Sequence, residues 1–179
     1  MQKEVQIVIC GAGPARDVGS LITQAISKGW AVQPIATQAA LDLDLVDVEA
    51  IKQLTGRAII STHGPSNSRR FGNPDIIIVA PATVNTIAKL ALGLADTFVA
   101  AHLNTAVGAK IPMVILPSLK KFNTDRPVFK RHVESLRDEG VKVLLGEGGI
   151  QPTNASSKDG PLPPFPWHLA VRETEKLML

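Results

Sequence analysis

The stretch Asp75-Ile76-Ile77-Ile78-Val79-Ala80-Pro81 decides the fold of this chain. Its apolar run is unbroken, which is typical of a strand that is covered on both faces. Strands of this kind lie at the centre of parallel sheets whose two faces carry helices. We therefore expect a buried central parallel strand over this stretch.

Strand-like and helix-like patterns alternate along the rest of the first 145 residues. Short β-rich runs occupy 5–10, 31–36, 57–60, 111–116 and 141–145. Helical patterns occupy 18–26, 39–54, 83–94 and 127–139. Five or six strands with crossovers of this length predict a right-handed, doubly wound parallel sheet. The expected fold class is therefore a single α/β domain, Rossmann-like (flavodoxin-like), over 1–145.

The remaining residues, 146–179, are rich in proline and glycine. The segment 161–168 is too apolar for a free linker and too rich in proline for a helix. We expect this tail to pack on the domain or on a neighbouring subunit, with Phe165 and Trp167 as anchors and a short terminal helix from Trp167.

Composition excludes several classes of protein. The chain has 179 residues, 45% hydrophobic and 20% charged, with a formal net charge of +3. Its acids and bases are mixed, so we expect no nucleic-acid partner. Its apolar runs are shorter than the roughly 20 residues of a membrane span, so no membrane association is expected. A single cysteine, Cys10, favours a cytoplasmic protein without a disulfide and without a metal site.

Small, polar or glycine-rich residues follow four of the predicted strands. Ligands of open parallel sheets bind beyond the carboxyl ends of the strands, where the strand order reverses. The segments in question are 11–14, 37–40, 81–86 and 117–120. We therefore expect the binding site to be built from these segments.

The first two segments each allow two interpretations. Gly11 and Gly13 let the backbone approach an anion closely, and the amides of the following helix suit a phosphate. The third glycine of a dinucleotide fingerprint and the lysine of a P-loop are missing, so a plain tight turn fits as well. Thr37 either faces a ligand or only caps a helix.

The segment 81–86 places two hydroxyls and a carboxamide on the first turn of a helix. Thr83, Asn85 and Thr86 could bind a phosphate or a carboxylate there. The alternative is a capped helix start, in which Thr83 satisfies a free amide and Asn85 and Thr86 face solvent.

Residues 81–97 carry a resemblance to a known family. Pro81-Ala82-Thr83-Val84-Asn85-Thr86, the following helix and Gly93-Leu94-Ala95-Asp96 closely resemble the Pro-Ala-Ser/Thr-Ala-Asn-Thr and Gly-x-x-Asp signature of the homo-oligomeric flavin-containing cysteine decarboxylases. That superfamily includes phosphopantothenoylcysteine decarboxylase, the lantibiotic peptidyl-cysteine decarboxylases and, more distantly, the flavin prenyltransferases. The similarity runs in order from Val5 to about Leu145, and the ending Phe165-Pro166-Trp167-His168-Leu169-Ala170 resembles that of an actinobacterial branch.

The resemblance implies an FMN cofactor and a homo-oligomer, a trimer or a multiple of trimers. It implies roles for His63 as the catalytic base, Asn85 in holding the substrate carboxylate, and Leu119 in packing against the flavin. The residues that it implies for FMN binding are Gly11, Ala12, Gly13, Thr37, Ala82, Thr83 and Thr86. The flavin would oxidise a thiol-bearing carbon, so that the resulting thioaldehyde accepts the electrons left by decarboxylation.

The segment after the predicted strand at 111–116 departs from the family pattern. The family has Pro-x-Met-Asn-x-x-Met-Trp, whereas this chain has Pro117-Ser118-Leu119-Lys120-Lys121-Phe122-Asn123-Thr124. Leu119 can replace the methionine, but Lys120 brings a cation where the family has an amide. We expect a different substrate, with Lys120 either attracting an acid or phosphate or lying in a solvated loop.

Two further departures concern the catalytic groups. His63 lies 18 residues before Pro81, and a gapless comparison brings Asn67 closer to the expected place. An insertion within 64–70 would restore His63, and the alternative is an exposed loop histidine. No cysteine follows Cys10, which disfavours the coenzyme A pathway reaction and makes the peptidyl-cysteine enzymes the better analogue. Cys10 itself is expected to pack in the core.

The resulting hypothesis is an FMN-binding flavoprotein that acts as an oxidative decarboxylase on a cysteine-containing carboxylate, either a peptide or a small molecule. One alternative is a noncatalytic flavin-binding or assembly protein. The other is a flavin prenyltransferase-like enzyme, for which Arg69, Arg70, Lys120 and Lys121 would supply the groups that hold an isoprenyl phosphate.

Overall fold

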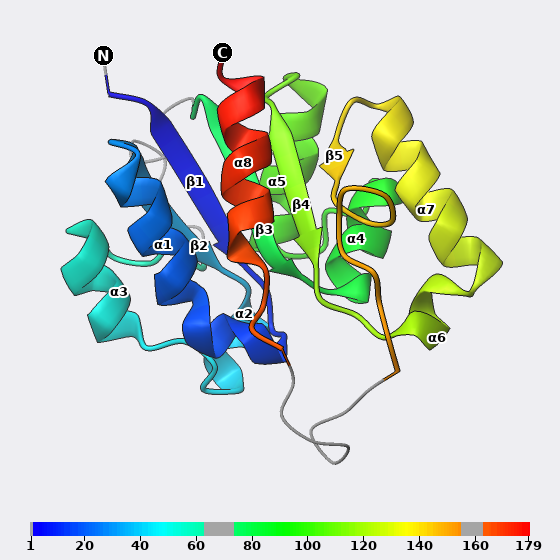
Figure 1. Cartoon of the computed structure of the whole chain (residues 1–179), viewed down its shortest axis with the longest axis horizontal. Helices are drawn as coiled ribbons and strands as arrows, with labels where there is room; N and C mark the ends of the chain where they lie inside the picture. The colour runs from blue at the N-terminus through cyan, green and yellow to red at the C-terminus, as the bar shows by residue number, and fades with distance from the viewer. Residues whose placement is uncertain (1, 63–73, 155–162) are drawn as a thin grey trace.

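The computed structural model describes residues 2–62, 74–154 and 163–179. Within them, the strands form one parallel sheet in the order β2-β1-β3-β4-β5 (Figure 1). The strands are β1 (Glu4–Ile9), β2 (Ala31–Ala36), β3 (Ile76–Ala82), β4 (Met113–Pro117) and β5 (Lys142–Val143). This order is that of flavodoxin-like folds, and its reversal point lies between β1 and β3. The predicted fold class is confirmed.

The apolar run at 76–80 forms β3, which is the central strand. It pairs with β1 on one side, where Val5 lies opposite Ile76, and with β4 on the other, where Ile77 lies opposite Met113. All seven residues of β3 are buried. The strand is hydrophobic at every position because helices cover both of its faces.

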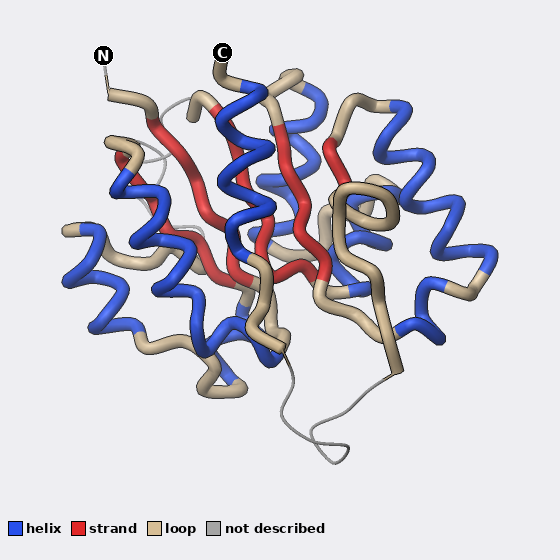
Figure 2. The backbone as a smooth tube through the Cα atoms, in the orientation of Figure 1, coloured by secondary structure: helices blue, strands red, loops and turns tan. Residues whose placement is uncertain are grey.

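Two layers of helices cover the sheet (Figure 2). One layer contains α1 (Val18–Ser27), α3 (Val48–Thr55) and α8 (Trp167–Leu177), and the other contains α4 (Val84–Ala91), α5 (Phe98–Gly108) and α7 (Pro127–Asp138). Successive residues of a strand point to opposite faces. Ile7 and Ile9 therefore pack under the first layer, whereas Val8 and Cys10 pack under the second.

Three short helices lie in the loops that follow strands, and all of them precede a longer helix. They are η1 (Gly13–Asp17) after β1, α2 (Gln38–Asp42) after β2 and α6 (Lys121–Thr124) after β4. They sit at the carboxyl edge of the sheet, where the site is expected (Figure 1).

Two predicted elements differ from the structure. The expected strand at 57–60 is reduced to a parallel bridge between Ile60 and Ile35. The expected helical segment at 39–54 is divided into α2 and α3, because the carboxylate of Asp47 accepts a hydrogen bond from the Ala50 amide at 2.9 Å and starts a new helix there. Gly56, with a φ of 67°, ends α3 in the left-handed conformation.

The terminal helix α8 packs against α1 and over β3 and β4. The buried indole of Trp167 donates its Nε1 hydrogen to Asp17 at 3.1 Å, and Phe165 meets it edge-on at 4.6 Å between ring centroids. An ion pair of 2.8 Å joins Lys28 to Glu175 at the other end of α8. Among the described residues, we find no helix with the length and apolar character to cross a membrane.

Candidate functional site

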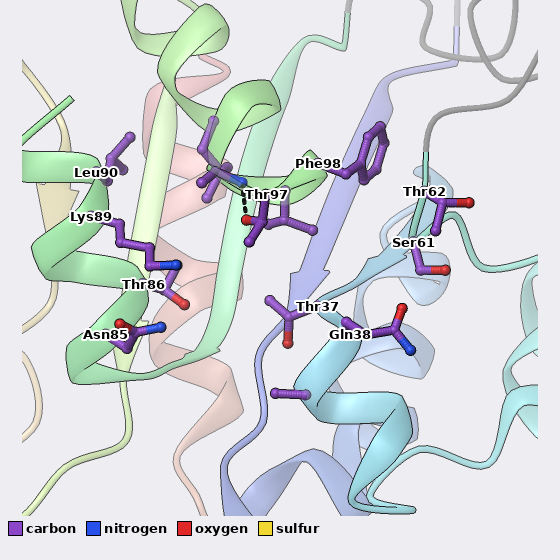
Figure 3. A pocket seen from close by; sticks show the side chains of 14 residues that line it. Thr37, Gln38, Ser61, Thr62, Asn85, Thr86, Lys89, Leu90, Thr97 and Phe98 are labelled. Atoms are coloured by element: carbon purple, nitrogen blue, oxygen red, sulfur yellow. Dashed lines mark hydrogen bonds between the residues drawn. The ribbon is translucent and has the colours of Figure 1, made fainter. Parts of the chain in front are cut away.

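A cavity of about 420 Å³ opens at the carboxyl edge of the sheet (Figure 3). Its volume lies within the roughly 300–1,000 Å³ that is typical of small-molecule sites. Thr37 and the start of α2, which follow β2, line it together with residues 61–62, α4 and the start of α5. The lining residues are Thr37, Gln38, Ala39, Ser61, Thr62, Asn85, Thr86, Lys89, Leu90, Thr97, Phe98, Val99, Ala100 and Leu103.

Thr37 stands at the start of α2 and faces this cavity. Its hydroxyl oxygen accepts a hydrogen bond from the Ala40 amide at 3.3 Å, so it caps the helix as one interpretation predicted. A threonine hydroxyl that accepts such a bond still has a hydrogen to donate. The capping role is therefore compatible with contact to a ligand.

The glycine turn after β1 lies directly against α2. A Cβ atom on Gly11 would come within 3.1 Å of the carbonyl carbon and the methyl group of Ala39, which lines the cavity. A Cβ atom on Gly13 would meet nothing within 4 Å. Gly11 thus allows a close approach of two backbone segments, whereas Gly13 borders open space.

The first turn of α4 combines both roles that its sequence allowed. The hydroxyl of Thr83 accepts a hydrogen bond from the Thr86 amide at 3.2 Å and lies 3.1 Å from the Thr86 hydroxyl. Thr83 caps the helix without lining the cavity, whereas Asn85 and Thr86 both line it. The exposed carboxamide of Asn85 points along the α4 wall of the cavity (Figure 3).

Cys10 directly follows β1, interacts with Thr83 and Thr86 of this turn and is fully buried. Burial raises the pKa of its thiol, an effect that hydrogen bonding to Thr86 and to the backbone of Thr83 only partly offsets. A buried neutral thiol of this kind is unreactive. The structure therefore agrees with a packing role for Cys10.

Lys89 reaches the cavity from α4, one turn after Asn85. Its ammonium group contacts both carboxylate oxygens of Asp96, at 2.9 and 2.8 Å. The hydrogen bond from Lys89 holds the pKa of Asp96 below its usual value. Thr97 follows immediately and caps α5 by accepting a hydrogen bond from the Ala100 amide at 3.2 Å.

Phe98 forms an aromatic part of the wall at the start of α5. Its ring stacks on His102 with centroids 6.4 Å apart and an interplanar angle of 9°. Burial lowers the pKa of His102, so its imidazole is more readily held in the neutral form. His102 lies behind Phe98 and does not line the cavity itself.

The remaining predicted site residues lie elsewhere or cannot be placed. Leu119 packs against the core of the α4, α5 and α7 layer, and neither it nor Lys120 lines the cavity. The loop of Lys120 is joined to the tail, because the Lys121 amide donates to the Thr153 carbonyl at 3.2 Å. The predictions for His63, Asn67, Arg69 and Arg70 fall outside the described residues.

Several lining residues were not predicted. Ser61 and Thr62 follow Ile60, and the same rule that selected the other post-strand segments could have found them. Lys89 and Phe98 lie within or after helices, where no strand-end rule applies. In 2–62, 74–154 and 163–179, no cluster of three or more His, Cys, Asp or Glu residues is arranged to hold a metal ion.

Comparison with known proteins identifies the family. The family described as Flavoprotein matches residues 1–162. The chain belongs to the Flavoprotein family. The predicted family resemblance and the expected flavin cofactor are thereby confirmed.

The chain is also similar to individual proteins and solved structures. The coenzyme A biosynthesis bifunctional protein CoaBC of Thermococcus kodakarensis is 27% identical over 148 residues, which cover 79% of this chain. The chain spans only 36% of the length of that relative. The FMN-dependent cysteine decarboxylase SpaF has 25% identity and a TM-score of 0.66, covering 80% of this chain and 83% of SpaF. TvaF, from thioviridamide biosynthesis, shares the fold with a TM-score of 0.76 at 19% identity, with 99% of both chains covered.

Proposed function

We propose that this chain binds FMN at the carboxyl edge of its sheet and catalyses the oxidative decarboxylation of a thiol-containing carboxylic acid. The observation that carries the proposal is the convergence of Thr37, Asn85 and Thr86 on one cavity beside the Gly11 turn. Membership of the Flavoprotein family and the likeness to the cysteine decarboxylase SpaF support it.

The glycine turn fits the phosphate of FMN. The amides of Ala12 and Ala15 bond within the turn, to the carbonyls of Cys10 and Ala12 at 2.8 Å each. A phosphate would therefore take its hydrogen bonds from the amides of Gly11 and Gly13, and the open space beside Gly13 leaves room for it. The hydroxyls of Thr37 and Thr86 would hold polar groups of the same cofactor.

Asn85 fits the carboxylate of the substrate. FMN, when bound, supplies a two-electron oxidation at the carbon that bears the thiol. A neutral carboxamide orients a carboxylate by donating hydrogen bonds from its NH₂ group. It does so without the ion-pair strength that would oppose departure of carbon dioxide, because tight ground-state binding does not lower the barrier.

The cofactor half of the proposal has a direct test. Purified protein is expected to be yellow, with flavin absorption bands, and to release FMN when it is denatured. Apoprotein should regain the bands when FMN is added. A colourless preparation that does not bind added FMN would reject the proposal.

The proposed decarboxylation is tested with both peptide and small-molecule substrates. Holoprotein is incubated with peptides that end in cysteine and, separately, with small cysteine-containing acids. Decarboxylation with oxidation removes about 46 mass units, carbon dioxide plus two hydrogens, which mass spectrometry detects. Peptide-only or small-molecule-only turnover then defines the substrate class.

One observation favours a second candidate, a noncatalytic flavin-binding protein. Leu119 and Lys120, in the segment where the family resemblance implies substrate contacts, do not line the cavity. This candidate expects bound FMN without turnover of any acid in the same panel. The two candidates are separated by the mass measurement alone.

We also propose that the chain forms a homo-oligomer, a trimer or a multiple of trimers. Leu92 and Leu94, in the loop between α4 and α5, are 59% and 47% exposed, and large apolar side chains at such exposure suit a subunit contact. Light scattering coupled to size-exclusion chromatography measures the mass in solution. A monomeric mass would contradict the proposal.

A further inference from the structure

Lys89 is the one charged residue among the described residues that line the cavity. The polar part of the remaining lining consists of hydroxyl and carboxamide groups, which are neutral. A cation in such surroundings selects for a ligand with negative charge, because attraction between charges is stronger where water is partly excluded. The question is which negative group Lys89 meets.

The position of Lys89 relates it to Asn85. Residues four apart on a helix lie on the same face, so the two side chains share one wall of the cavity. Figure 3 shows this wall, with the Lys89 amino nitrogen beside Thr86 and the Asn85 carboxamide below it. A carboxylate held by Asn85 would therefore lie on the same side of the cavity as Lys89.

The partner of Lys89 lies outside the cavity. Asp96 is 58% exposed and does not line the cavity, whereas the Lys89 side chain is 22% exposed. A lysine ammonium has three N–H donors, and the two oxygens of Asp96 account for two contacts. Asp96 therefore balances the charge of Lys89 without lining the cavity and leaves donor capacity for a ligand.

We propose that Lys89 recognises the carboxylate of the substrate, and that Asp96 limits the strength of this attraction. The inference rests on the proposed function and adds that the substrate must present its carboxylate as an anion on the α4 wall. Partial neutralisation by Asp96 suits a carboxylate that later leaves as carbon dioxide, since a full unbalanced cation would stabilise the bound acid too strongly.

The two members of the ion pair give opposite expectations, which separates recognition from a merely structural role. Lys89→Gln removes the cation and should weaken binding of a carboxylate about tenfold, the size of one charge-assisted hydrogen bond. Asp96→Asn leaves the cation without its counter-charge and should tighten binding of the same carboxylate. If the pair only holds the loop between α4 and α5, both variants lose the same contact and shift binding in the same direction.

The experiment measures equilibrium binding to FMN-loaded protein by calorimetry. The probes are N-acetylserine, which has the carboxylate without the oxidisable thiol, and N-acetylserinamide, which lacks the negative charge. Lys176→Gln is the matched control, because Lys176 forms a 3.0 Å ion pair with Glu173 on α8, away from the cavity. Titration of apoprotein with FMN and with riboflavin shows whether Lys89 meets the phosphate of the cofactor instead.

The expected result is opposite shifts for Lys89→Gln and Asp96→Asn with the acid, no shift with the amide, and no effect of Lys176→Gln. The inference would be overturned if Lys89→Gln and Asp96→Asn shift the affinity for the acid in the same direction, or if they change the affinities for acid and amide equally. It would also be overturned if wild-type protein binds the acid no more tightly than the amide. If Lys89→Gln weakens the binding of FMN but not of riboflavin, Lys89 contacts the phosphate of the cofactor, and the inference is again overturned. Failure of wild-type protein to bind FMN would be a failure of the proposed function.

Discussion

His102 of α5 donates a hydrogen bond from Nε2 to Oε1 of Gln6 on β1 at 2.7 Å. Gln6 is almost fully buried on a strand whose other side chains are mainly aliphatic. The bond fixes α5 to the sheet one turn after Phe98, which forms part of the cavity wall. A polar contact in the core thus supports the shape of the site above it.

This contact predicts a dependence of stability on pH. Burial lowers the pKa of His102, so the unfolded chain binds a proton more readily than the folded protein. The free energy of unfolding should therefore fall as the pH drops below about 6.5, the ordinary value for histidine. Denaturant unfolding at pH 7.5 and pH 5 measures this change for wild type and for His102→Gln. Titratable groups elsewhere contribute equally to the pH dependence of wild type and of His102→Gln, so the difference between the two proteins reports on His102. An identical pH dependence in both would contradict the prediction.

Substitution of the two glycines after β1 should have unequal effects. A methyl group on Gly11 would press on the backbone of Ala39, so Gly11→Ala should lower the free energy of unfolding by about 1–3 kcal/mol and reduce the FMN content. Gly13→Ala serves as the control for stability, because its methyl group meets open space. Equal stability of the two variants would show that the close contact at Gly11 is not needed.

Asn85→Ala should separate cofactor binding from turnover. We expect the variant to retain FMN and to lose decarboxylation about 100-fold, the scale of a misplaced substrate. Asn85→Asp should lose more, because its negative charge repels the substrate carboxylate. Gln53→Ala, which removes an exposed carboxamide from α3, is the matched control. Turnover that survives in Asn85→Ala would remove Asn85 from the reaction.

The anchoring of α8 predicts a graded loss of stability. Trp167→Ala deletes a buried aromatic side chain and should cost about 3–5 kcal/mol in the free energy of unfolding. Trp167→Phe keeps most of the packing but removes the hydrogen bond to Asp17, for a loss of about 1 kcal/mol. Urea titrations measure both, and equal losses would show that the ring packing contributes little.

Cys10 offers a clean probe of the folded state, because it is the only thiol in the chain. Its burial and raised pKa predict very slow alkylation in native protein at pH 8 and rapid alkylation in denaturant. Mass spectrometry counts the added groups over time. Native labelling at the rate of free cysteine would show that this part of the site opens to solvent.

The sheet and part of the site could be predicted because both depend on local patterns. The apolar run at 76–80 determines a doubly covered strand, and parallel strands bring their carboxyl ends to one edge, which places Thr37 and Asn85 near each other. The break between α2 and α3 was missed, because it depends on a single cap by Asp47 within an otherwise helical pattern.

The rest of the cavity depends on packing between distant segments. The spacing within α4 puts Lys89 on the face of Asn85, but it does not show that the chain returns to bring Asp96 and Phe98 beside this face. Likewise, the sequence shows that Lys120 replaces an amide, but not that its loop is joined to the tail near Thr153.

The division of the helices into two layers has a practical consequence for engineering. Leu90, Val99 and Leu103 are buried aliphatic side chains that line the cavity, and they belong to the core of the α4, α5 and α7 layer, whereas α8 and α1 form the opposite side. Substitutions that strengthen the contact of α8 with α1, such as those around the Lys28 and Glu175 pair, can raise heat tolerance while leaving the cavity unchanged. The thermal stability of the protein and the ligand selectivity of its cavity can therefore be optimised independently, on opposite sides of the sheet.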